Sequence, residues 1–192
     1  MDKPMDFVTI VSGLPRSGTS MMMRILEAGG IAPVQDKQRT ANEDNPRGYY
    51  EYERVKALPT DKSWVPDARG SAVKIIYKLV YELPQGIPYR VLFMQREIAE
   101  VVRSQEKMLE REGLDPGRDQ RDIIADLFQS EIMAFRNWVA AQPDMKMHVV
   151  DYASVIASPE EQMAQISAFL GGGLDIAAMT AVVEPDLYRN RA

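Results

Sequence analysis

The sequence of 192 residues contains no cysteine and only one histidine, His148. Without cysteine it cannot form a zinc–thiolate centre, an iron–sulfur cluster or a cysteine nucleophile, and one imidazole is too few for a histidine-rich metal site. We therefore expect a protein that works without a metal ion.

Basic residues are few relative to acidic ones, because 23 Lys and Arg stand against 28 Asp and Glu, a formal net charge of −5. Nucleic acids and anionic membranes bind basic surfaces, so we expect no nucleic-acid partner, and any phosphate site must be local. No apolar run approaches the roughly 20 residues of a membrane span. The first residues carry acids, where a secretory signal is basic. These features predict a cytoplasmic protein without a membrane span.

The remaining composition is that of a globular protein, with 45% hydrophobic and 27% charged residues. At this length a single domain over residues 1–192 buries enough surface for a stable core. Short, nearly continuous apolar runs are typical of strands buried on both faces of a parallel sheet. Such runs occur at residues 7–11, 71–76, 89–95 and 147–151.

Helical patterns separate these runs. One ends at Gly29, a second begins after Arg96, and the last begins at residues 158–161 with the Ser-Pro-Glu-Glu pattern of a capping box. A longer one begins near Asp119 and places seven apolar residues on one side, namely Ile123, Ile124, Leu127, Phe128, Ile132, Phe135 and Trp138. The alternation predicts a three-layer α/β fold of the P-loop type, with a central, mainly parallel sheet and helices on both faces.

The segment Gly13-Leu14-Pro15-Arg16-Ser17-Gly18-Thr19-Ser20 lies between the first strand and the first helix and has the spacing of a Walker A loop. In such loops backbone N–H groups surround a phosphate at a helix N-terminus. Thr19 stands where a nucleoside triphosphatase has the lysine that bridges the β- and γ-phosphates. Arg16 instead supplies a permanent cation that can neutralise an anionic oxygen. The loop predicts a site for one phosphate and a neighbouring oxyanion.

A second anion site is predicted at Arg96, which directly follows the apolar run at residues 89–95. Ligands of parallel sheets bind at the C-terminal ends of the strands. Ser104 lies eight residues later on the following helix, a rise of roughly 12 Å that the arginine side chain partly spans. Arg96 and Ser104 can therefore hold a second phosphate from two sides.

The loop at residues 14–20 and the stretch Phe93-Met94-Gln95-Arg96…Arg103-Ser104 together resemble the two nucleotide-binding motifs of the sulfotransferases that use 3′-phosphoadenosine 5′-phosphosulfate (PAPS). Segments 45–51 and 152–171 are also similar to segments of the bacterial members, so the resemblance spans most of the chain. It implies that Arg96 and Ser104 hold the 3′-phosphate. It also implies that the 5′-phosphosulfate end is held by the loop residues Pro15, Arg16, Ser17, Gly18, Thr19 and Ser20.

The resemblance further implies transfer of a sulfuryl group from PAPS to a hydroxyl or amine of a small-molecule acceptor, with adenosine 3′,5′-bisphosphate as the product and no metal. In this interpretation Arg16 stabilises charge on the bridging oxygen. Two features depart from the family, because many cytosolic members have lysine in place of Arg16 and a glycine-rich C-terminal segment that has no evident counterpart here. Arg189 and Arg191 are candidates for late basic contacts, with a solvated tail as the other interpretation.

The acceptor must lose a proton, so a general base has to lie within hydrogen-bonding reach of it. Many relatives carry His or Asp-Pro directly after a lysine of the second strand, whereas Lys74 is followed here by two isoleucines. We predict Glu51 as the base and Lys74 as a residue that binds the sulfuryl group. His148 is the other candidate base, but it lies roughly 10 Å below the end of its strand, where a histidine packed in the sheet is the favoured interpretation.

Residues 31–70 are a polar excursion, in which we expect one short helix near residues 49–58 and the acceptor pocket. Its aromatic residues either wall that pocket or pack in the core. They are Tyr49, Tyr50, Tyr52 and Trp64.

Two other functions stay open at the level of the sequence. Asp151 can imitate a Walker B aspartate, which favours a small-molecule kinase that uses ATP and Mg²⁺, although the loop lacks the kinase lysine. A noncatalytic nucleotide-binding relative is the third possibility. The sequence determines neither the acceptor nor the oligomeric state.

Overall fold

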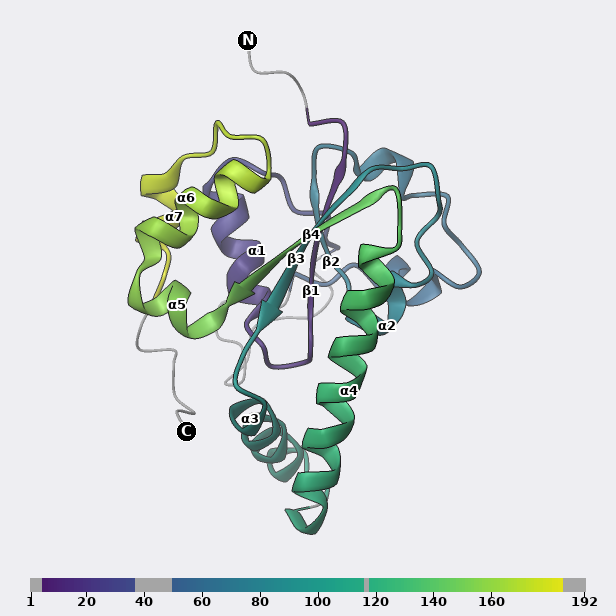
Figure 1. The fold of residues 1–192 in the computed structure, drawn as a ribbon, viewed down its shortest axis with the longest axis vertical. Coiled ribbons are helices and arrows are strands. Elements are labelled where there is room, and N and C mark those ends of the chain that lie inside the picture. Colours follow the sequence, from purple (N-terminus) through teal and green to yellow (C-terminus); the bar gives the residue numbers. More distant parts are fainter. Residues whose placement is uncertain (1–4, 37–49, 116–117, 185–192) are drawn as a thin grey trace.

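A computed structural model describes residues 5–36, 50–115 and 118–184. Its four strands form one parallel sheet in the order β2-β1-β3-β4 (Figure 1). Their bounds are β1 Val8–Gly13, β2 Ala72–Lys74, β3 Tyr89–Gln95 and β4 Met145–Asp151. The register pairs Ile10 of β1 with Val73 on one side and Val91 on the other. The four predicted runs are therefore strands, and the predicted parallel sheet is confirmed.

Helices cover both faces of this sheet, which confirms the predicted three layers. Helices α1, α5, α6 and α7 lie on one face, and α2 and α4 lie on the other (Figure 1). The α-helices are α1 Thr19–Ala28, α2 Tyr77–Val80, α3 Ile98–Arg111, α4 Arg121–Ala140, α5 Tyr152–Ala157, α6 Pro159–Phe169 and α7 Ile176–Ala181. The 3₁₀ helices are η1 Glu53–Ala57, η2 Pro66–Ala68 and η3 Arg118–Gln120.

The two halves of the core follow from the alternation of side chains along the central strands. In β3, Phe93 packs on the α2 and α4 side, whereas its neighbours Leu92 and Met94 pack on the α1 and α6 side. Each is at most 1% exposed. Burying such a side chain contributes about 1.5–3 kcal/mol, so the central strands hold both helical layers and fix the strand ends where the loops emerge.

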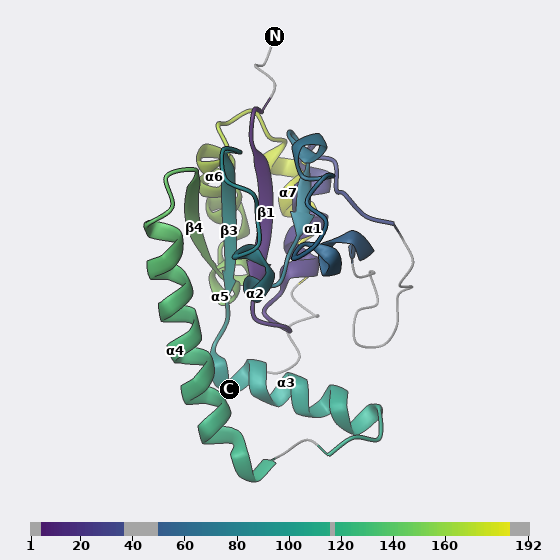
Figure 2. The ribbon, with the colours of Figure 1, turned by 90° about the vertical axis from the view of Figure 1, so that its right-hand side faces the viewer.

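Helix α4 differs from the sequence expectation. Its last turns pack on the sheet through the buried Phe135 and Val139, but its first half extends past the sheet beside α3 (Figure 2). Ile123 is therefore 69% exposed and Leu127 is 51% exposed. The seven apolar residues assigned to one side do not share one buried face, because a 20-residue helix is longer than the sheet edge that it covers.

Several local expectations also need correction. In the described part of the polar excursion, the 3₁₀ helix η1 lies within the range 49–58 expected for a short helix, whereas η2 was not predicted. The pattern also did not predict α2, α5 or α7. Ser158 is the N-cap of α6, but its side chain makes no capping hydrogen bond, so the capping box is wrong. Ser158 is also the C-cap of α5, where its N–H donates to the Ser154 carbonyl at 2.9 Å. Because it ends one helix and begins the next, its backbone angles have to suit both. None of the described helices has the length and apolarity that a membrane span needs.

Candidate functional site

The Gly13–Ser20 loop joins β1 to α1 at the C-terminal end of the sheet. Arg16 has a φ of 71° and Gly18 a φ of 100°, both in the left-handed region. The turn is closed by the N–H of Ser17, which donates to the Leu14 carbonyl at 3.2 Å, and the N–H of Met22 donates to the Gly18 carbonyl at 3.1 Å. A non-glycine residue held at positive φ costs about 1–3 kcal/mol, a strain typical of ligand-binding loops.

The two glycines of the loop are required by their surroundings. A Cβ atom on Gly13 would lie 2.5 Å from the Ser17 Oγ and 2.7 Å from the Met94 carbonyl oxygen. A Cβ atom on Gly18 would lie 2.5 Å from the ring of Tyr152. The loop therefore packs so closely against β3 and α5 that only glycine fits at both positions.

Arg96 brings the second predicted anion site to this loop. It directly follows β3, its side chain is 8% exposed, and its Nη1 donates to the Arg16 carbonyl at 3.3 Å. The Arg16 Nε in turn donates to the hydroxyl of Ser104 on α3 at 3.0 Å. Arg16, Arg96 and Ser104 are thus in one connected group at the C-terminal end of the sheet.

Two residues that the sequence analysis missed hold the guanidinium of Arg96. Glu100, one turn into α3 and 3% exposed, accepts a hydrogen bond from its Nε at 2.8 Å. The ring of Tyr152 lies against the Arg96 guanidinium, with 4.7 Å between ring centroid and Cζ. Burial raises the pKa of the Tyr152 hydroxyl. The spacing Arg96…Glu100 is the ordinary i, i+4 ion-pair signal, but nothing in the sequence links Tyr152 to Arg96.

Lys74 and Glu51 meet on the other side of the loop. Lys74 ends β2, and its Nζ donates to the Ser20 Oγ at 3.4 Å and lies 3.6 Å from the Glu51 Oε1. The side chains of Lys74 and Glu51 are 12% and 30% exposed. The ammonium of a lysine in a central layer is thereby paired with a carboxylate and a hydroxyl, which removes most of the cost of burying it. The structure brings both predicted residues next to the loop, and their roles stay predictions.

Ser17 offers a direct indication that the loop is built for a ligand. Its side chain is 1% exposed, and in the described part of the chain its Oγ has no hydrogen-bond partner. A buried hydroxyl without a partner costs roughly 1–3 kcal/mol. An anion at the first turn of α1, where the N–H groups of the helix also lack intrahelical partners, would satisfy it. Pro15 is exposed and Thr19 is half-buried in the same loop.

Asp151 and His148 both lie on β4, but Asp151 caps a helix whereas His148 packs against an aromatic ring. The Asp151 carboxylate caps α5, because its Oδ1 accepts from the N–H and the Oγ of Ser154, both at 2.7 Å. His148 pairs in register with Leu92, three residues before the strand end, and its ring lies 5.4 Å from that of Phe169. The placement agrees with the interpretation of a histidine packed in the sheet. Within the described residues, no group of three metal-ligating side chains gathers.

The aromatic residues of the excursion divide between two roles. Trp64 is 5% exposed and packs edge-to-face with Tyr52 at 5.2 Å, so this pair belongs to the core. Tyr50 donates to the Glu27 Oε2 at 2.6 Å, and burial and this bond raise its pKa to about 12. Tyr49, residues 45–48 and the C-terminal Arg189 and Arg191 lie outside the described residues.

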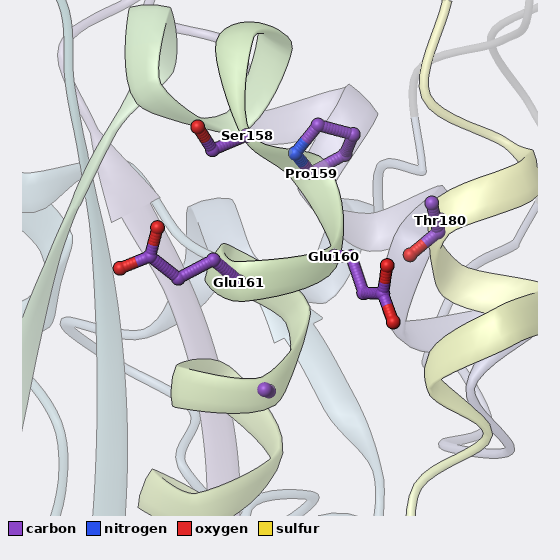
Figure 3. Close-up of a pocket in the computed structure, with 6 residues that line it drawn as sticks. Ser158, Pro159, Glu160, Glu161 and Thr180 are labelled. Atoms are coloured by element: carbon purple, nitrogen blue, oxygen red, sulfur yellow. The ribbon is translucent and has the colours of Figure 1, made fainter.

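A separate pocket of about 580 Å³ opens between the start of α6 and α7 (Figure 3). Its lining contains none of the predicted site residues. Figure 3 shows the side chains of Glu160 and Thr180 facing each other across the gap between the two helices. With two carboxylates, Glu160 and Glu161, in its lining, this pocket is poorly suited to a nucleotide phosphate.

The close packing at Gly18 gives a testable expectation with a matched control. Gly18→Ala should lower the unfolding free energy by about 2–5 kcal/mol, because it adds left-handed strain and overlap with the Tyr152 ring. Gly30→Ala has the same φ of 100° with nothing within 4 Å, so it should cost only the backbone part, about 1–2 kcal/mol. Urea unfolding of the two variants measures the difference. Equal losses would contradict the predicted contact between the loop and α5.

His148 should make stability depend on pH. Burial lowers its pKa, so the unfolded chain takes up a proton near pH 6.5 while the folded chain does not. Because the unfolded state binds more protons in that window, stability should fall as the pH falls through and below about 6.5. Melting temperatures of wild type and His148→Phe between about pH 7.5 and 5.5 test this. The variant should show the flatter curve, and parallel curves would disprove the assignment.

Comparisons with known proteins give a fold. No protein-family model and no curated protein matches the sequence. The sulfotransferase domain from the curacin biosynthetic pathway aligns with 96% of this chain and 80% of its own, at a TM-score of 0.54 and 14% identity. Sulfotransferase STF9 from Mycobacterium avium aligns with 94% of this chain and 67% of its own chain, at a TM-score of 0.56 and 14% sequence identity.

A sulfotransferase from Alicyclobacillus acidocaldarius aligns with 97% of this chain and 89% of its own, at a TM-score of 0.52 and 15% identity. At such identities the likeness concerns the path of the backbone, while site chemistry has to be argued from side chains. The three alignments cover 94–97% of this chain, so the likeness extends along nearly its whole length. The chain has the fold of the bacterial-type sulfotransferases.

Proposed function

We propose that this protein is a PAPS-dependent sulfotransferase that transfers a sulfuryl group to a hydroxyl or amine of a small molecule. The observation that carries the proposal is the contact of Arg96 with the loop, where its Nη1 donates to the Arg16 carbonyl at 3.3 Å. It joins a buried guanidinium to a glycine loop at the C-terminal end of a sulfotransferase-like sheet. A nucleotide with phosphates at both ends of its ribose matches two such neighbouring anion sites.

The residues present fit this nucleotide. Ser17, with its buried unpartnered hydroxyl, and the first N–H groups of α1 would hold the 5′-phosphate, together with Gly18, Thr19 and Ser20. Arg96 and Ser104 would hold the 3′-phosphate. Glu100 and Tyr152 keep the Arg96 guanidinium in one plane, so little side-chain entropy is lost on binding.

When bound in the loop, the nucleotide would supply a sulfuryl group activated by its bond to a 5′-phosphate oxygen, and it would leave as adenosine 3′,5′-bisphosphate. Arg16 stabilises the negative charge that develops on that phosphate oxygen. Glu51 accepts the proton of the acceptor hydroxyl. Lys74, 3.6 Å from Glu51, orients this carboxylate and attracts the sulfuryl oxygens. In such loose transition states, positioning and charge stabilisation supply most of the acceleration.

Ligand-dependent melting tests the nucleotide half of the proposal. At 100 times its Kd, adenosine 3′,5′-bisphosphate should add roughly 2.7 kcal/mol of stability, which raises the melting temperature by roughly 5–10 °C. ATP with Mg²⁺ should give a smaller shift. The reverse order would favour the kinase, for which Asp151 would have to leave its capping role on α5.

Transfer itself needs a second assay. A panel of alcohols, phenols and amines with ³⁵S-labelled PAPS should yield a labelled product and adenosine 3′,5′-bisphosphate in equal amounts. Tight nucleotide binding without transfer of label to any acceptor of the panel would indicate a noncatalytic relative.

A further inference from the structure

The main chain that follows Glu51 is held by a residue from another part of the sequence. Asp36 makes two hydrogen bonds to it: the Asp36 N–H donates to the Glu51 carbonyl at 3.2 Å, and the Asp36 Oδ2 accepts from the N–H of Glu53 at 2.6 Å. Glu53 begins η1, and the N-cap of this helix, Tyr52, makes no side-chain capping bond. Asp36 therefore supplies the acceptor that the first turn of η1 lacks locally, and it fixes the carbonyl next to the Glu51 Cα atom.

Asp36 is itself tied to the sheet. Just before it, the Val34 N–H donates to the Ala72 carbonyl at 2.8 Å, and the Ala72 N–H donates to the Ala32 carbonyl at 2.9 Å. Ala72 is the first residue of β2, and Lys74 is the last. Asp36 and Lys74 are thus anchored to the same short strand, so Asp36 can hold Glu51 at a fixed place relative to the lysine.

The main chain that precedes Glu51 is held as well. Tyr50 has a φ of 51°, in the left-handed region that a tyrosine rarely adopts. Its hydroxyl donates to the Glu27 Oε2 on α1 at 2.6 Å. A strained backbone of this kind persists only where the surroundings hold it, and it is typical of functional sites. Glu51 thus lies between two fixed points, and its Oε1 lies 3.6 Å from the Lys74 Nζ.

We propose that Asp36 is a positioning residue, which holds Glu51 where its carboxylate meets Lys74. Asp36 acts through the main chain of residues 51–53 and is assigned no contact with the nucleotide or the acceptor. Its role in the reaction rests on the proposed function, in which Glu51 accepts the proton of the acceptor. A base must lie within hydrogen-bonding reach of that proton, and a misplacement of about 1 Å can cost roughly 10²-fold in rate. Asp36 therefore contributes to kcat without touching the reacting atoms.

Carbodiimide coupling tests the placement without turnover. A water-soluble carbodiimide links an amine to a carboxylate that lies in contact with it, so the wild type should yield a Lys74–Glu51 crosslink, measured by peptide mass spectrometry. Asp36→Ala removes the acceptor of the Glu53 N–H and should lose most of this crosslink. Asp36→Asn should retain it, because the amide oxygen can accept from the same N–H.

Asp61→Ala is the matched control. Asp61 lies in the same polar excursion and also accepts from a main-chain N–H, that of Ser63 at 3.0 Å. Its replacement removes a comparable local bond but leaves Asp36 in place, so the crosslink should form as in the wild type. A wild type without the crosslink, an unchanged yield in Asp36→Ala, or an equal loss in Asp61→Ala would overturn the proposal.

Kinetics with labelled PAPS test the consequence for catalysis. Asp36→Ala should lower kcat roughly 10–100-fold, with the Kd of adenosine 3′,5′-bisphosphate within about twofold of the wild type, and Asp36→Asn should recover most of kcat. In the Glu51→Gln background, Asp36→Ala should cost nothing further, because no base is left to position. Additive losses in the double variant would contradict the positioning role. A lost crosslink with unchanged kcat would support the placement and instead remove Glu51 from its role as the base.

Discussion

Replacement of Arg96 by alanine is expected to weaken the binding of adenosine 3′,5′-bisphosphate by about 2–5 kcal/mol, the range for removing one partner from a desolvated charge pair. The side chain is 8% exposed and its guanidinium is oriented by Glu100, by the Arg16 carbonyl and by the Tyr152 ring. In the proposed site, alanine would leave a bound 3′-phosphate with only the Ser104 hydroxyl. The loss should therefore be specific to ligands that carry this phosphate.

Titration calorimetry with a pair of ligands separates this contact from a general loss of structure. The wild type should prefer adenosine 3′,5′-bisphosphate over AMP, and Arg96→Ala should bind both with similar affinity. The variant also leaves Glu100 buried without its cation, which can cost about 3–5 kcal/mol of stability. The double variant Arg96→Ala/Glu100→Ala removes that penalty and should show the same loss of preference. A preference that persists in both variants would place the 3′-phosphate elsewhere.

Glu51→Gln should reduce kcat by roughly 10²–10⁴-fold, the usual contribution of a positioned general base. Glutamine keeps the size of the side chain and its reach toward Lys74, whose Nζ lies 3.6 Å from the Glu51 carboxylate, but it cannot accept the acceptor proton. The affinity for adenosine 3′,5′-bisphosphate should stay within about twofold, because Glu51 is not assigned a nucleotide contact.

Steady-state kinetics with labelled PAPS and the best acceptor measures this effect. Glu53→Gln is the matched control, because Glu53 lies two residues away and, among the described residues, its carboxylate pairs with the exposed Lys56 at 2.9 Å. It should leave kcat unchanged. If Glu51→Gln retained full kcat, the base would have to be another group, and the His148→Phe variant would then be the next to measure.

The strands, the glycine loop and the position of Arg96 at a strand end could be predicted from the sequence because their signals are local. Strand β3 has the predicted bounds of Tyr89–Gln95, since a continuous apolar run between polar ends is typical of a strand buried on both faces. The spacing of Gly13 and Gly18 predicted a tight glycine loop between a strand and a helix, and both glycines have positive φ in the structure. Arg96 was recognised because it directly follows a strand end, where parallel sheets bind ligands.

The support around these residues could not be predicted in the same way. Tyr152 touches both Gly18 and Arg96, although it lies 134 and 56 residues away along the chain. Such a contact depends on the crossover that brings β4 beside β3. Short helices such as α2 and α5 have too few turns to give a periodic pattern. For α4, periodicity located the helix, but the length of the neighbouring sheet edge decided which turns are buried.

The amino-acid order alone thus determined the four strands, the glycine loop and the longer helices α1, α3, α4 and α6, because backbone propensity, apolar period and turn chemistry act over a few neighbouring residues. Only the tertiary structure decided that Arg96, Glu100 and Tyr152 form one group against the glycine loop. It also decided that Lys74 meets Glu51, and that half of α4 is exposed to solvent. These contacts join residues far apart in sequence, and their geometry depends on how the whole sheet and its helices pack.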